Sequence, residues 1–101
     1  MVYITQLIYL KPGQETIFEQ FESVAIPLIS KYRGKLLLRL RLPAGAEIIE
    51  SNMEPPYEMH LVSFESEADF GRFMQDEERQ KFLHLKDQAI RESILIKGAA
   101  L

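Results

Sequence analysis

The chain has 101 residues, of which 47% are hydrophobic and 27% are charged, and its formal net charge is -3 at pH 7. This length predicts one domain, residues 1–101, with a single core. The acidic balance argues against binding to nucleic acid, which usually needs clustered positive charge. The sequence has no cysteine, signal peptide or apolar run of about 20 residues, so we expect a cytoplasmic protein with no disulfide and no membrane span.

Residues 2–10 predict the first strand. β-branched and aromatic side chains dominate there, and the segment ends in the turn sequence Lys-Pro-Gly. Side chains alternate between the two faces of a strand, but both faces here mix apolar and polar residues. We expect Ile4, Ile8 and Leu10 to point toward the helices, which leaves Thr5 on the opposite face.

Residues 14–32 predict a helix of more than four turns, because apolar side chains recur every three or four positions. Pro27 lies inside this stretch. Proline removes one backbone donor and clashes with the carbonyl four residues before it, so we expect a kink or a break near residues 24–25. Gly34 then provides a stop signal.

The segment 34–41 predicts a second strand with one dry face and one charged face. Its even-numbered leucines would point toward the helices, whereas Arg39 would point away from them. Residues 57–64 predict a third strand with the same division, in which Glu58 and His60 share the polar face. Two neighbouring strands therefore place charged and titratable side chains on one side of the predicted sheet.

The rest of the chain predicts an irregular segment, a second helical region and a last strand. Proline and glycine interrupt residues 43–56. Ser66 is expected to cap a second helix, which breaks at residues 76–79 and continues over 82–89. Residues 94–97 predict a short strand.

This order, strand-helix-strand-strand-helix-strand, predicts the α+β class and the ferredoxin-like arrangement, with an antiparallel sheet and both helices on one face. Right-handed crossovers place the first and second strands on either side of the third. Thr5, Arg39 and His60 then lie on neighbouring strands. We expect these three side chains to share the face away from the helices.

Several local signals recur in a group of small α+β proteins: Pro27 followed by Tyr32 and Gly34, a strand ending in Arg39, Glu54-Pro55-Pro56, Phe64 with Ser66, and Gly98. On these signals nearly the whole chain resembles the dimeric α/β-barrel proteins, closest to an uncharacterised bacterial branch known as a domain of unknown function. Relatives of this architecture include cofactor-independent monooxygenases of antibiotic biosynthesis, muconolactone isomerases and haem-binding proteins. The resemblance implies a homodimer with sheets packed face to face, and a pocket between sheet and helices or inside the barrel.

The chain departs from that branch at several positions. Arg33 stands where the branch usually has the first glycine of a pair, and Arg79 stands where a tyrosine is frequent. Leu40 and Arg41 replace the glycines that commonly follow the arginine. Only Arg39 carries over by position as a candidate pocket residue.

His60 is the candidate catalytic residue, because an imidazole exchanges protons near neutral pH. Arg39, Glu58, Thr5 and Tyr9 are candidate ligand-binding residues, since a guanidinium binds carboxylates and a tyrosine hydroxyl orients phenols or enols. Structural alternatives remain open: His60 as an interface residue, Arg39 paired with Glu58 or a partner's carboxylates, Tyr9 as a packing residue. No metal-binding spacing or nucleotide motif is present, so we expect neither metal nor cofactor.

Two functions follow from these patterns. The first is the binding of a small molecule. If the protein is an enzyme, the resemblance implies cofactor-independent oxygenation or isomerisation of a small acidic organic compound. The second is a non-catalytic dimeric structural or interaction module, whose polar face is a self-satisfied ion-pair network. Space beside Arg39 and His60 would favour the first function, and a filled interface would favour the second.

Overall fold

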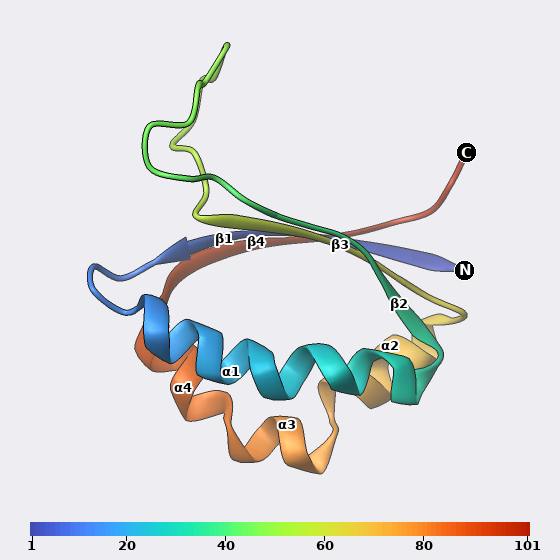
Figure 1. Cartoon of the computed structure of the whole chain (residues 1–101). Coiled ribbons are helices and arrows are strands. Elements are labelled where there is room, and N and C mark those ends of the chain that lie inside the picture. Colours follow the sequence, from blue (N-terminus) through green and yellow to red (C-terminus); the bar gives the residue numbers. More distant parts are fainter.

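A four-stranded antiparallel sheet carries all the helices on one of its faces (Figure 1). The computed structural model describes residues 1–101. The strand order is β2-β3-β1-β4, so the first and second strands flank the third as predicted. The elements are β1 (Val2–Leu10), α1 (Glu15–Leu28), the 3-10 helix η1 (Ile29–Tyr32), β2 (Gly34–Arg41), β3 (Glu58–Phe64), α2 (Glu67–Met74), α3 (Glu77–Lys81), α4 (Leu83–Ala89) and β4 (Ile90–Gly98).

The predicted α+β class and ferredoxin-like order are confirmed, and the faces of β1 are as expected. Ile4 and Ile8 are buried under the helices, and Leu10 packs against the same core. None of the helices has both the length and the apolar character needed to cross a membrane. The core consists of two clusters, one made by Val2, Ile4, Ile29, Val62 and Phe64 and the other by Ile8, Phe18 and Ala89.

The break predicted near residues 24–25 is wrong, because α1 runs without interruption to Leu28. Pro27 lies in the last turn, where only one helical residue follows it and the backbone changes to the tighter turns of η1. Arg33 ends η1 in the left-handed conformation with φ 57°, the conformation for which glycine is favoured at a helix end. Glycine would adopt this conformation without the steric cost that a Cβ brings.

The face predicted for the second half of β2 is also wrong. The register shifts between Leu36, which pairs with Val62, and Leu38, which pairs with Leu61, so Leu37 is an extra residue in the strand. Such a β-bulge reverses the alternation beyond it. Arg39 therefore pairs with His60 on the side that faces the helices. The face predicted for Glu58 and His60 is wrong as well, because β3 turns both side chains toward the helices, together with the core residues Val62 and Phe64.

The same bulge moves two leucines to the opposite face. Leu38 and Leu40 are 44% and 47% exposed on the side without helices. Thr5 also lies on this open face, as predicted, so the sheet separates it from the side chains of Arg39 and His60. We call this helix-free side the open face; its central side chains are Thr5, Leu7, Leu38, Leu40, Met59, Leu61, Ile94 and Ile96.

Candidate functional site

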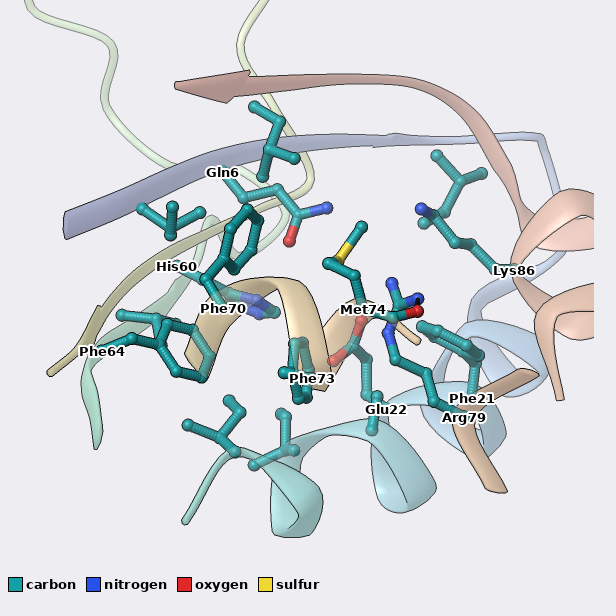
Figure 2. Close-up of a pocket in the computed structure, with 17 residues that line it drawn as sticks. Gln6, Phe21, Glu22, His60, Phe64, Phe70, Phe73, Met74, Arg79 and Lys86 are labelled. Atoms are coloured by element: carbon teal, nitrogen blue, oxygen red, sulfur yellow. Dashed lines mark hydrogen bonds between the residues drawn. The ribbon is translucent and has the colours of Figure 1, made fainter. Parts of the chain in front are cut away.

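A cavity of about 70 Å³ lies between the sheet and the helices. Figure 2 shows Gln6 and His60 approaching it from the sheet and Glu22 and Arg79 from the helical side. Most of its wall is apolar, since 12 of its 17 lining residues are hydrophobic. The cavity thus combines an apolar body with a few polar groups, which is the usual composition of a small-molecule site.

His60 reaches the cavity wall because it shares the helix-facing side of β3 with Glu58. Glu58 is fully buried, and one of its carboxylate oxygens contacts His60 Nε2. Arg39 Nε donates to Glu58 Oε2 at 2.9 Å, and Arg41 Nη2 donates to Oε1 at 2.6 Å. Burial alone would raise the pKa of Glu58, but the hydrogen bonds from His60, Arg39 and Arg41 outweigh it and lower the pKa to about 2. Glu58 is therefore an ionised anchor for His60 at neutral pH.

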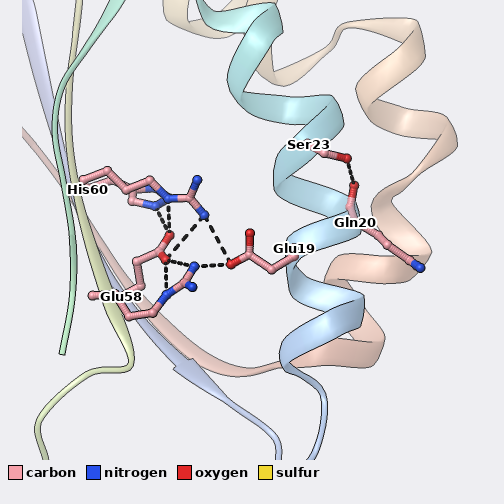
Figure 3. A network of polar contacts seen from close by, with 7 residues as sticks. Glu19, Gln20, Ser23, Glu58 and His60 are labelled. Atoms are coloured by element: carbon pink, nitrogen blue, oxygen red, sulfur yellow. Dashed lines mark hydrogen bonds and ion pairs between the residues drawn. The ribbon is translucent and has the colours of Figure 1, made fainter. Parts of the chain in front are cut away.

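Both arginines also pair with Glu19, which reaches across from α1 (Figure 3). The Arg39 Nη2 to Glu19 Oε1 distance is 3.5 Å. Arg39 thus finds its carboxylates within its own chain, at Glu58 and Glu19, and it is not among the residues that line the cavity. The geometry agrees with the structural alternative for Arg39, in which Glu58 is its partner.

Glu22 is the most unusual acid of the chain. It lies one helical turn after Glu19, only 6% exposed, and takes part in no hydrogen bond or ion pair. Burial raises the pKa of this carboxyl, and the charges of His60 and Arg39 counteract that rise only in part. A buried, unpaired carboxyl beside a cavity is able to hold or release a proton there.

Arg79 completes the polar part of the cavity. Its backbone N–H donates to Asp76 Oδ1 at 3.0 Å, which caps α3 and fixes the start of that short helix. The guanidinium packs 5.3 Å from the ring centre of Phe73 and 5.8 Å from that of Phe21, and the residue is 6% exposed. Its only side-chain hydrogen bond is a long one, from Nη1 to Met74 O at 3.4 Å, and Nε has no partner.

Tyr9 and Thr5 lie away from this site. The Tyr9 hydroxyl donates to Glu54 O at 2.9 Å, and the Arg91 guanidinium stacks 5.6 Å from the Tyr9 ring centre. Thr5 pairs with Leu61 and Ile96 on neighbouring strands, on the open face. The structure therefore brings together three of the five predicted site residues, His60, Glu58 and Arg39.

Three charged residues of the cavity could not be recognised as its lining from the sequence: Glu22, Arg79 and Lys86. A signal for Glu22 existed, because it lies four residues after Phe18 and three before Ala25, inside the apolar stripe of α1. Arg79 and Lys86 lie in short helical segments without a clear apolar period. No group of three or more His, Cys, Asp or Glu side chains is arranged to hold a metal ion.

No known family model matches the sequence. No curated protein matches it either. Several solved structures share its fold.

One of these solved structures is a Rhodopseudomonas palustris protein of unknown function. It matches with a TM-score of 0.82 and 16% identity, over 99% of this chain and 82% of that one. A dabb family protein with a ferredoxin-like fold from Mesorhizobium loti matches with a TM-score of 0.67, 16% identity, and coverage of 99% and 96%. An uncharacterized NIPSNAP domain protein from Burkholderia xenovorans matches with a TM-score of 0.70, 9% identity, and coverage of 100% and 95%. These likenesses establish a ferredoxin-like α+β fold, a class of protein that hosts many unrelated functions.

Proposed function

We propose that the protein binds a small organic acid in the cavity between sheet and helices, and that His60 acts on it as a general acid or base. The observation that carries this proposal is the position of His60, on the wall of an apolar cavity and held there by a buried carboxylate. A carboxylate that binds one imidazole nitrogen fixes the orientation of the ring. Nε2 is taken by Glu58, and Nδ1 has no partner within the chain.

Isomerisation is the reaction that these side chains support most directly. It needs one group to remove a proton and one to return it at another atom, so the atoms balance without a further reactant. His60 and Glu22 are two titratable groups that line the same cavity, one from the sheet and the other from α1. Oxygenation without a cofactor, the other reaction that the resemblance suggests, also starts with removal of a proton from the substrate.

A thermal-shift screen of small organic acids tests the proposal, because a ligand that binds only the folded state raises the melting temperature. For any acid that binds and is converted, we expect His60→Gln to reduce turnover at least tenfold while the melting shift persists. His84→Gln is the matched control, since His84 is exposed on α4 and does not line the cavity. Equal turnover in the His60 variant would contradict a catalytic role.

We also propose that two copies pair through the open face. Its central side chains are uncharged, and large exposed apolar surfaces on soluble proteins usually mark contacts with a partner. The molecule extends 37 by 35 Å in its two longer directions, which offers room for the roughly 800 Å² per partner of a stable interface. The segment 42–57 projects from the same side, where Ile49 is 91% exposed (Figure 1).

A non-catalytic dimeric module is the second candidate function. The observation in its favour is that Arg39, Arg41, Glu58 and Glu19 satisfy one another without a ligand. If this candidate is right, no acid in the screen will raise the melting temperature, and His60→Gln will change only stability.

A further inference from the structure

We infer that Arg79 anchors the ligand and that the cavity is built for the carboxylate of a short-chain monocarboxylic acid. This inference rests on the proposed binding function and adds the anchoring residue and the chemical class of the ligand. It moves the anion site from Arg39, whose guanidinium is already paired, to Arg79, which lines the cavity from the helical side.

The first support is the unmet hydrogen-bonding capacity of Arg79. A guanidinium carries five N–H donors in a planar fork and no acceptor. The side chain is more than nine-tenths buried, its Nε has no acceptor, and its single side-chain bond is 3.4 Å long. Buried polar groups nearly always have partners, and the poorly bonded guanidinium of Arg79 belongs to a residue that lines the cavity, so a ligand oxygen there would supply the missing acceptor. A carboxylate fits the fork with two parallel bonds.

The second support is the charge around the cavity. Lys86 also lines it, so the wall carries two basic side chains against the single carboxyl of Glu22. Burial, and then the nearby charge of Arg79, lower the pKa of Lys86. Glu22 makes no ion pair with either base. An added anion would relieve the repulsion between Arg79 and Lys86.

The third support is the size and lining of the cavity. An apolar protein cavity of 150 Å³ takes up benzene, whereas this one measures about 70 Å³. An acid with a short alkyl chain therefore fits better than an aromatic one. Beyond Arg79 the chain would lie against Phe64, Phe73 and Leu95, which line the same cavity.

Calorimetric titration with acetate and acetamide tests the inference, because both are small enough for the cavity and the amide has nearly the same shape but no charge. In the native protein we expect acetate to bind at least tenfold more tightly than acetamide. Arg79→Met removes every donor while keeping an apolar stem, and it should abolish this preference. Arg72→Met is the control for net charge, since Arg72 is exposed on α2 and does not line the cavity; it should keep the preference.

Equal binding of acid and amide to the native protein would overturn the inference, and so would an undiminished preference in Arg79→Met or a complete lack of acetate binding. If Arg79→Met fails to fold, two measurements still test the inference. One is the comparison of acid and amide binding in the native protein, and the other is the same comparison in the variant Arg79→Lys. Failure of the proposed binding function would give a different pattern of results. If neutral compounds bind and Leu95→Trp, which fills the cavity, removes that binding, the cavity is a binding site without an anion anchor. If nothing in the wider screen binds, both proposals fall.

Discussion

Arg39 lies directly opposite His60 in the β2–β3 ladder, and both side chains point toward the helices. Their common partner is Glu58, which is fully buried between them and the helical layer. Because the β-bulge at Leu37 creates this pairing, a feature of the backbone decides that the polar network belongs to the interior of the molecule. The network holds His60 at the cavity wall and joins the sheet to α1 through Glu19.

The low pKa of Glu58 predicts a specific loss of stability in acid. The unfolded chain takes up this proton near pH 4.5 and the folded protein only near pH 2. Between these values the unfolded state binds more protons, so the contribution is complete above about pH 5 and falls as the pH approaches 2. We expect on the order of 1–2 kcal/mol, since the exposed parts of Arg39 and Arg41 let solvent screen the charge. Urea unfolding of the native protein and Glu58→Gln at several pH values measures it: the difference between them should shrink as the pH falls. A constant difference would contradict the assignment.

The two glutamates that bind the arginines should differ in their effect on stability at neutral pH. Glu58→Gln leaves two partly buried cations without their buried carboxylate and should lower the free energy of unfolding by about 3 kcal/mol. The Glu19 side chain is 44% exposed, so Glu19→Gln should cost less than about 1 kcal/mol. Urea denaturation of both variants provides the comparison, and similar losses would show that the network does not centre on Glu58.

Gly34 should not tolerate even a methyl group. A Cβ at this position would lie 2.6 Å from Ile29 Cγ2 and 2.7 Å from Phe64 Cε1, distances that force the core to shift. We expect Gly34→Ala to lower the free energy of unfolding by about 1–3 kcal/mol. Gly71→Ala is the matched control, because nothing lies near its Cβ and alanine favours a helix; it should stabilise the protein by up to about 1 kcal/mol. Equal effects of the two changes would contradict the packing at the start of β2.

The proposed pairing through the open face can be measured by light scattering. The native protein should have twice the chain mass of 11.7 kDa at micromolar concentration. Leu40→Lys places a charge on the open face, where the side chain is 47% exposed, so it should yield a folded monomer. A monomeric native protein would refute the pairing, and a dimeric Leu40→Lys protein with native stability would place the interface elsewhere.

The order of the strands and helices could be predicted from the sequence, because their apolar periods and turn residues are strong local signals. The burial of Ile4 and Ile8 followed from the same reasoning. The orientation of Arg39 could not be predicted in this way. The segment around Leu37 is a run of leucines, and nothing in such a run marks which residue is the extra one in the strand.

The candidate site was harder to predict because its charged groups come from distant parts of the chain. His60 and Glu58 were found by their alternation within one strand. Glu22 and Arg79 meet at the cavity only after the chain folds: Glu22 lies within the apolar stripe of α1, whereas Arg79 resembles an ordinary surface residue when only its neighbours in sequence are considered. Burial without a partner makes them distinctive, and burial is a property of the tertiary structure.

The extra residue at Leu37 gives the fold a simple route to change its chemistry during evolution. Deleting that one residue would restore the regular alternation of β2 and turn Arg39 and Arg41 to the open face, while Leu38 and Leu40 would take their places under the helices. No substitution is needed for this exchange. A gain or loss of a single codon in this strand would therefore transfer two positive charges between the helix-covered side of the sheet and the open face.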